Sequence, residues 1–349
     1  MKPYVAARIP ERDLIFVTGA GGVVGQALLQ RFPHRRFICL VHKKPVGGSN
    51  VSAVCGDVRQ PLLGLSPDAY DNLARRISCI VHSAAITDFT MPKDEILAVN
   101  VDGTQRVLEL AARAGVPVYH ISTAFVHPRE ECDPTPYERS KTAAEGLVKE
   151  SGLGATIVRP SVILGDSVTG EIANFQGFHF LVALFLKGLL PFVPTRPDSY
   201  IDFVPQDFVA DAIGALVEQR RTGEEVWLTA GTRALRIDDI VDGCLTDIPR
   251  EGAPLGRPNM ISQDTYERLF KPVFFHALPK GQKKLMDRAM TMVKYLNTLE
   301  PLPCASPALV RSLKIPQMPD PRVTLRSTLS FLAQHYRMVP ERARTWATG

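Results

Sequence analysis

The chain has few cysteines, and none stands in an arrangement that would give it a chemical role. Six cysteines occur among 349 residues, with no CxxC pair and no cysteine/histidine cluster at zinc-like spacing. We therefore predict no metal site. Cys39 and Cys79 lie inside apolar runs, where a thiol behaves as a small core residue. Such sparse cysteines indicate a reducing compartment without disulfide bonds.

Basic runs and a leader sequence are also missing. No run of five or more lysines or arginines occurs and the net charge is +5, so nucleic-acid binding is not indicated. The first ten residues, MKPYVAARIP, lack the apolar stretch of a signal peptide. We therefore expect a cytoplasmic protein.

No apolar run is long enough to span a bilayer. The most apolar stretch, residues 177–193, is interrupted by His179, Lys187, Gly188 and Pro191. It is shorter than the roughly 20 residues that a spanning helix needs. The stretch predicts a buried helix; the alternatives are a wall for an acyl substrate or a peripheral contact with a membrane surface.

The residues that are present have a globular composition, 45% hydrophobic and 22% charged. Strand-like apolar runs alternate with helical patterns such as residues 101–114, which indicates a parallel sheet covered on both faces. We expect strands at residues 14–19, 36–41, 79–85, 116–123 and 155–165.

The texture changes after about residue 165, where phenylalanine and proline become frequent, and the tail from Ser262 predicts helices joined by proline turns. The fold class that we predict is α/β: a Rossmann-type doubly wound parallel sheet with a smaller, mainly helical C-terminal substrate domain. Residues 1–170 would form the nucleotide-binding domain, with strands at about 201–230 returning to it. Residues 171–200 and 231–349 would form the substrate-binding lid.

Three glycines at intervals of three, Gly19, Gly22 and Gly25, stand between the first strand and a helical pattern. In a strand–turn–helix, the first glycine permits the tight turn and the second lets the backbone approach a pyrophosphate. The third lets the helix pack closely on the sheet, and the N-terminus of the helix attracts the negative charge. The stretch TGAGGVVGQ, residues 18–26, therefore predicts a dinucleotide site.

The residues after the second strand indicate which dinucleotide binds. A carboxylate there would hold the ribose 2′-hydroxyl of NAD, but the chain reads His42, Lys43, Lys44. No acid is available for that hydroxyl and cations stand ready for a 2′-phosphate, so we favour NADP(H). Asp57 follows the next apolar run, where it either holds the adenine amino group or caps a turn.

Tyr137 and Lys141 lie four residues apart, on one face of a predicted helix. A neighbouring ammonium stabilises a phenolate and lowers its pKa, so the tyrosine can exchange a proton with a carbonyl or alcohol oxygen. Thr123 ends a strand and would hydrogen-bond the same oxygen. The histidines at 82, 120 and 127 are interpreted as packed or surface residues, and His179 as a candidate to face the substrate.

These motifs together resemble an extended short-chain dehydrogenase/reductase over roughly residues 13–240. The matching elements are TGAGGVVG, GDV, HSAA, AVNVDGT, ISTAFV, YERSK and RPSVILG, in the order and at the intervals of that family. The resemblance implies a Rossmann-type fold and catalytic roles for Thr123, Tyr137 and Lys141, with Asn100 positioning a water or the active-site helix. It also implies that Ala84 and Ala85 line the cofactor, and that residues 160–162 lie near the nicotinamide.

Patterns and resemblance together give one set of candidate residues. The catalytic candidates are Thr123, Tyr137, Lys141 and Asn100. The cofactor-binding candidates are Thr18, Gly19, Gly22, Val23, Val24, Gly25, His42, Lys43, Asp57, Val58, Ser83, Ala84, Ala85, Asn100, Tyr137, Lys141, Pro160 and Val162.

Residues 56–85, 159–171 and 175–179 are similar to a narrower branch, the thioester reductases and fatty acyl-CoA reductases. That likeness implies an NADPH-dependent enzyme that reduces an acyl thioester, bound to CoA or a carrier protein, to an aldehyde. Two departures stand out: His42 replaces a frequent arginine, and no carrier or adenylation domain is recognised, so we expect the substrate to be taken in trans.

Alternatives remain within the fold and outside it. One is a hydroxysteroid enzyme or a nucleotide-sugar epimerase or dehydratase, and another is a non-catalytic NADP sensor, which could dispense with the tyrosine–lysine pair. A homodimer is common for this fold, but nothing in the sequence shows one.

Overall fold

A parallel sheet forms the centre of the molecule. The structure is a computed structural model, and it describes residues 13–42, 45–88, 91–129, 133–190, 192–248, 255–273, 283, 286–287, 289–293, 297–305 and 307–336. Its seven strands lie in the order β11-β6-β5-β4-β1-β2-β3, and each neighbouring pair is parallel. This confirms the Rossmann-type sheet that the sequence predicts. The strands are β1 (Leu14–Thr18), β2 (Phe37–Val41), β3 (Val51–Cys55), β4 (Ile77–His82), β5 (Val118–Ile121), β6 (Thr156–Pro160) and β11 (Glu225–Leu228).

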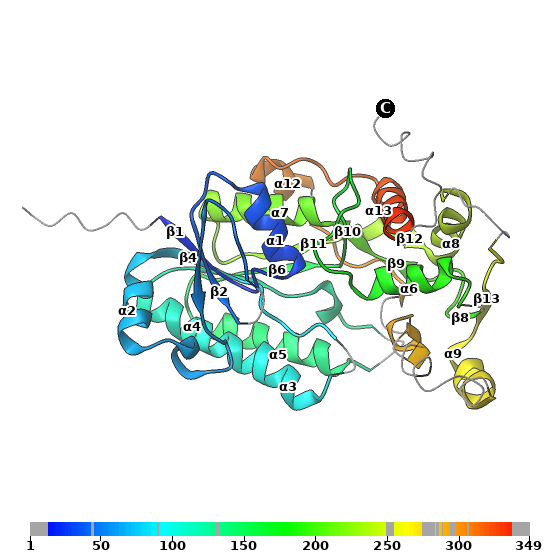
Figure 1. Ribbon diagram of the computed structural model, residues 1–349, viewed down its shortest axis with the longest axis horizontal. Helices are drawn as coiled ribbons and strands as arrows, with labels where there is room; N and C mark the ends of the chain where they lie inside the picture. The colour runs from blue at the N-terminus through cyan, green and yellow to red at the C-terminus, as the bar shows by residue number, and fades with distance from the viewer. Residues whose placement is uncertain are drawn as a thin grey trace, which may run out of the picture.

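Helices cover both faces of the sheet (Figure 1). One layer holds α1 (Val23–Arg31), α7 (Gln206–Glu218) and α12 (Pro307–Leu313), and α7 packs on both of the others. The other holds α2 (Pro67–Arg76), α4 (Gly103–Ala114), α5 (Pro136–Glu150), α3 (Lys93–Leu97) and the short turns η1 (Pro61–Gly64), η2 (Ala98–Asp102) and η3 (Ala124–Val126). The residues of the inner strands are mostly buried between two apolar clusters, one for each layer, whereas those of the edge strand β3 are not buried.

The order of the strands sets the position of the site. From β1 the chain runs outward through β2 to β3, then crosses to β4 and continues through β5 and β6 in the opposite direction. The carboxyl ends of β1 and β4 therefore flank the point where the winding reverses. Open α/β sheets bind their ligands in the crevice at such a point.

A third apolar cluster lies beyond the sheet, at the right of Figure 1. Its principal helices are α6, α8 and α13, and most of the apolar residues of α6 are buried in it. The elements of this region are β7 (Val162–Leu164), α6 (Gly177–Leu186), β8 (Phe192–Pro194), β9 (Tyr200–Ile201), β10 (Phe203–Pro205), η4 (Gly231–Arg233), β12 (Leu235–Arg236), α8 (Ile237–Thr246), β13 (Asn259–Ile261), α9 (Gln263–Thr265), η5 (Tyr266–Phe270), β14 (Asn297–Thr298) and α13 (Pro321–His335).

Two expected elements differ from the observed ones. The strand expected at 155–165 is divided at Ser161 into β6 and β7, and β7 pairs with β10 outside the main sheet. The strand expected at 79–85 begins at Ile77 and ends at His82, which leaves residues 83–85 as a loop over the crevice. Among the described residues, no helix is both long and apolar enough to cross a membrane.

Candidate active site

The glycine turn between β1 and α1 is shaped by close backbone contacts. Gly19 has φ +71°, and a Cβ on it would lie 2.5 Å from the backbone of Ser83 and Ala84 in the loop after β4. A Cβ on Gly25 would lie 2.6 Å from the Gly19 carbonyl oxygen. The Gly22 amide donates to that oxygen at 2.9 Å, and α1 begins at the next residue. This bare turn at a helix N-terminus fits a pyrophosphate.

Thr18 precedes this turn and is fully buried. It stands at one end of a buried network of hydrogen bonds. Its Oγ1 accepts from the Ala84 amide at 3.3 Å and lies 2.7 Å from His82 Nδ1. His82 Nε2 lies 3.0 Å from Thr104 Oγ1, which donates to the Asn100 carbonyl at 2.7 Å. Because the Thr104 proton is used there, His82 must donate from Nε2, and Thr18 must donate to Nδ1. Burial lowers the pKa of His82 to about 3, which keeps the ring neutral.

Asn100 extends this network of hydrogen bonds to α5, the helix that carries Tyr137 and Lys141. It lies in η2, a π-helical turn, and its side chain is buried. Its amide donates to Ser140 Oγ at 2.9 Å, and the Ser140 hydroxyl donates to the Tyr137 carbonyl at 2.6 Å. The Asn100 side chain also bonds both backbone groups of Ile86. Asn100 therefore connects the loop after β4 with α5 and does not itself line the cavity.

Helix α5 begins at a capping box. Thr135 Oγ1 accepts from the Glu138 amide at 3.0 Å, and the Glu138 carboxylate accepts from the Thr135 amide. The same carboxylate forms a buried ion pair with Arg129. These bonds fix the first turn of α5, where Tyr137 lies.

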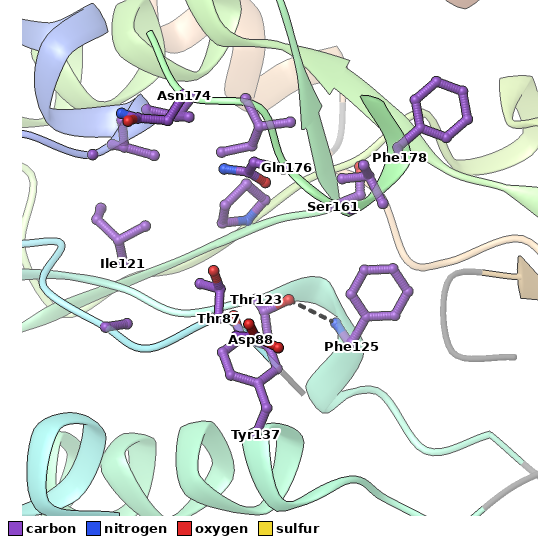
Figure 2. Close-up of a pocket in the computed structure, with 18 of the residues that line it drawn as sticks. Thr87, Asp88, Ile121, Thr123, Phe125, Tyr137, Ser161, Asn174, Gln176 and Phe178 are labelled. Carbon is purple, nitrogen blue, oxygen red and sulfur yellow. Dashed lines mark hydrogen bonds between the residues drawn. The ribbon is translucent and has the colours of Figure 1, made fainter. Parts of the chain in front are cut away.

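A cavity of about 600 Å³ extends from the glycine turn, past the first turn of α5, to the third apolar cluster. Figure 2 shows Thr87, Asp88, Thr123 and Tyr137 on one side of it and Gln176 and Phe178 on the other. Of the candidates, the cavity is lined by Gly22, Val23, Val24, Ser83, Ala85, Thr123, Tyr137, Lys141, Pro160 and Val162.

The environment of Tyr137 differs from the expectation of an acidified phenol. Burial raises the pKa of Tyr137 to about 12, while its hydrogen bond with Thr123 acts in the opposite direction. The expected lowering by Lys141 is therefore not seen in this structure, because desolvation of the phenolate dominates. Thr123 Oγ1 also accepts from the Phe125 amide at 3.3 Å, so its proton remains available to a second acceptor.

Lys141 is buried on the wall of the same cavity. Its amine donates to the Ile121 carbonyl at 2.7 Å and lies 3.4 Å from His120 Nε2. Burial lowers the pKa of Lys141 from 10.5 to about 8, against the opposing effect of Glu145. The amine is therefore mainly charged at neutral pH, on the side of α5 that faces the sheet.

The remaining candidates lie elsewhere. His42 Nε2 is 3.4 Å from the Asp57 carboxylate, which Arg59 also binds and whose pKa that bond lowers. An acid, Asp57, thus lies near the end of β2 although none follows that strand in the sequence, and Arg59 engages its carboxylate. The Val58 side chain is buried against Gly103. Lys43 lies outside the described residues.

Asn174 and Met292 line the cavity and were not predicted, whereas residues 175–178 and Phe180 belong to the stretch that the sequence offered as a wall for an acyl substrate. Asn174 donates to the Gly21 carbonyl at 2.9 Å and so joins the loop before α6 to the glycine turn. Gln176, Phe178 and Met292 line the far part of the cavity. Asn174, directly before the stretch FQGFH, had no signal of its own in the sequence. His179, expected near the substrate, is buried behind Phe175, whose ring stacks on it.

About half of the chain, residues 43–213, matches one family model. The family model described as "Male sterility protein" matches residues 43–134 and 129–213. The chain is 27% identical to the L-2-aminoadipate reductase large subunit of Penicillium chrysogenum over 298 residues. This alignment covers 67% of this chain and 20% of that protein. It is 26% identical to a putative fatty acyl-CoA reductase of Drosophila melanogaster, over 57% of this chain and 50% of that one.

Solved structures give the same result. The terminal R domain from the myxalamid PKS-NRPS biosynthetic pathway superimposes with a TM-score of 0.74 at 25% identity, over 94% of this chain and 92% of that one. This chain spans about a fifth of the aminoadipate reductase subunit and half of the insect protein. The chain belongs to the extended short-chain dehydrogenase/reductase family, in its thioester reductase and fatty acyl-CoA reductase branch.

Proposed function

We propose that the chain is an NADPH-dependent reductase that converts an acyl thioester to an aldehyde. The observation that supports this best is the single cavity that joins the glycine turn, the hydroxyls of Thr123 and Tyr137 and a wall of apolar side chains. The names of two relatives, the L-2-aminoadipate reductase large subunit and a putative fatty acyl-CoA reductase, agree with this assignment.

The cofactor would lie along the bare glycine turn with its pyrophosphate at the N-terminus of α1. Bound there, a nicotinamide nucleotide supplies the hydride for the carbonyl carbon. Ser83, Ala85 and Pro160 line this cavity and would flank the nicotinamide, and the Lys141 ammonium on the same wall would bind a ribose hydroxyl.

The chain's own hydroxyls act on the substrate oxygen. Thr123 and Tyr137 donate hydrogen bonds to the thioester carbonyl, so negative charge that develops on the oxygen is stabilised. Tyr137 then transfers its proton to that oxygen to give a hemithioacetal, whose C–S bond breaks to release the thiol and the aldehyde. The phenylalanines of residues 175–180 and Met292 form the apolar wall where an acyl chain would lie.

The test uses purified protein, NADPH and thioesters of one acyl chain on CoA and on a carrier protein. Loss of NADPH absorbance with formation of an aldehyde is expected. Tyr137→Phe should abolish turnover and leave NADPH binding within about twofold, because the phenyl ring keeps the packing. Retained turnover in Tyr137→Phe, or no oxidation with any thioester or ketone, would refute the assignment, as would tightly bound NAD after purification.

The preference for NADPH over NADH is the second part of the proposal. Its support is the sequence His42-Lys43-Lys44. A further cation, Arg59, is near His42, because both side chains contact the Asp57 carboxylate. His42→Asp places a carboxylate directly after β2. We expect this variant to weaken NADPH binding about tenfold or more and to spare NADH, since a carboxylate repels a 2′-phosphate and accepts from a hydroxyl. Equal losses for both nucleotides would contradict the assigned preference.

The carrier is the third part. We propose that the acyl group arrives on a carrier protein, because the R domain with which the chain superimposes comes from a PKS-NRPS pathway. A value of kcat/KM that is higher for the carrier-bound thioester than for the same acyl-CoA is the expected result. A preference for acyl-CoA would instead indicate the fatty acyl-CoA reductase type of substrate.

A further inference from the structure

A histidine lies behind the lysine of the cavity. His120, on β5, is fully buried, and its Nε2 is 3.4 Å from the Lys141 amine, which also donates to the Ile121 carbonyl at 2.7 Å. We propose that His120 is a positioning residue for Lys141: its neutral imidazole accepts a hydrogen bond from the ammonium and, with the Ile121 carbonyl, fixes the charged amine at the wall of the cavity.

The proton positions follow from the partners. An ammonium has donors only, so Nε2 of His120 must accept, and the single proton of the neutral ring must lie on Nδ1. His82, whose ring centre is 5.4 Å away, cannot take that proton, because Thr18 and Thr104 already use both of its ring nitrogens. His120 Nδ1 accordingly has no hydrogen-bond partner within the described part of the chain.

An unpaired, buried N–H is costly, and an aliphatic side chain would avoid that cost. The contact with Lys141 is the only hydrogen bond that the described residues make to the His120 ring. A polar ring at this position is therefore explained by the lysine that it contacts and not by packing.

The surrounding charges keep His120 an acceptor. The titratable groups facing it are Lys141 from α5, His82 from β4 and Arg159 from β6, and Glu145 lies one turn beyond Lys141. Burial, together with the two cations, holds the pKa of His120 well below its ordinary value. Near neutral pH the ring is uncharged and does not repel the ammonium.

The contact favours the charged form of the amine. A hydrogen bond from an ammonium to a neutral nitrogen is roughly twice as strong as one between neutral groups, so the bond stabilises protonated Lys141 more than the free amine. Removing the acceptor must therefore raise the acid dissociation constant of Lys141. We expect about a tenfold increase, because part of the ammonium solvation is lost and the Ile121 carbonyl remains.

The test compares His120→Leu, which removes the acceptor at similar volume, with His120→Gln, whose amide oxygen supplies a new one. Lysines labelled with ¹³C at Cε are titrated by NMR, and Lys141 is identified as the signal absent from Lys141→Met. His120→Leu should increase the acid dissociation constant of Lys141 about tenfold, and His120→Gln should restore it to within about threefold. An unchanged Lys141 titration in His120→Leu, or equal shifts in both variants, would overturn the proposal.

Two further measurements complete the test. In the unmodified protein, ¹⁵N–¹H correlations should show the His120 proton on Nδ1; a proton on Nε2 near neutral pH would overturn the assignment even if both variants fail to fold. The alkaline limb of the pH profile for thioester reduction should move down by about one pH unit in His120→Leu and return in His120→Gln. This last step rests on the proposed function: a shifted Lys141 titration in a protein that reduces no thioester would refute the function and leave the role of His120 standing.

Discussion

Replacing Lys141 with methionine should stabilise the fold while abolishing reduction. The lysine is fully buried, and its pKa falls from 10.5 to about 8. At pH 7 this difference corresponds to about 3 kcal/mol of lost stability, at roughly 1.4 kcal/mol for each pH unit. Methionine keeps the length of the side chain without the charge. Loss of the hydrogen bonds to the Ile121 carbonyl and to His120 offsets about 1 to 2 kcal/mol of the gain, so the expected net stabilisation is about 1 to 2 kcal/mol.

The sign of the pH dependence follows from the lowered pKa. Below pH 8, Lys141 is charged in both the native and the unfolded chain, and the full cost of burying the charge is present. Between pH 8 and about 10.5 the native state has lost the proton and the unfolded state still binds it. The native stability therefore rises with pH through this window relative to that of Lys141→Met, and the advantage of the variant disappears.

The assay is reversible urea unfolding of both proteins at pH 7 and pH 10. Lys149→Met is the matched control, since Lys149 lies on the same helix with its side chain half exposed and paired with Glu225, where an ion pair contributes little. A Lys141→Met variant that is less stable than the native protein at pH 7 would refute the reasoning. So would a free-energy difference between the two that is the same at both pH values.

Three other substitutions test the supports of the site. Gly19→Ala places a Cβ 2.5 Å from the Ala84 amide nitrogen in a left-handed conformation, so we expect a loss of more than about 2 kcal/mol in urea unfolding and no detectable nucleotide binding by calorimetry. Glu145→Gln weakens the buried pair with Arg159, whose two bonds measure 2.8 and 2.6 Å, and should cost about 2 to 4 kcal/mol in the same unfolding assay. Thr104→Val leaves a buried imidazole N–H without its acceptor, and a loss of about 1 to 3 kcal/mol is expected, with kcat falling more than nucleotide affinity; an unchanged stability would show that the buried network of hydrogen bonds is not fully formed.

The local parts of the site could be predicted from the sequence. The glycine turn is set by spacing, because a strand, three glycines and a helix leave only one arrangement for the backbone. The pairing of Tyr137 with Lys141 on one face follows from the helical period, and both line the cavity. Thr123 was predictable for a different reason: it follows a parallel strand, and the carboxyl ends of parallel strands meet at one edge of the sheet.

Contacts between residues on two different strands, such as that of His82 with His120, could not be predicted in the same way. His82 and His120 stand in separate apolar runs, and each alone is more often a packed residue. Only the pairing of β4 with β5 places them opposite each other, with Lys141 above. The role of Arg59 was not predicted for a related reason. Its bond to Asp57 depends on a tight turn at residues 57–60, and the sequence shows only a charge in a loop.

The raised pKa of Tyr137 bears on the direction in which the site works best. An oxidation would need the phenolate as a base, and a pKa of about 12 makes that form scarce at neutral pH. A reduction needs the phenol as a donor, and the alkoxide that forms from a carbonyl is basic enough to take its proton. Burial therefore keeps Tyr137 in the form that the proposed reduction uses. The group that titrates near neutrality is then Lys141, whose pKa is about 8, so the charge beside the substrate is set by the lysine and its partners and not by the tyrosine itself.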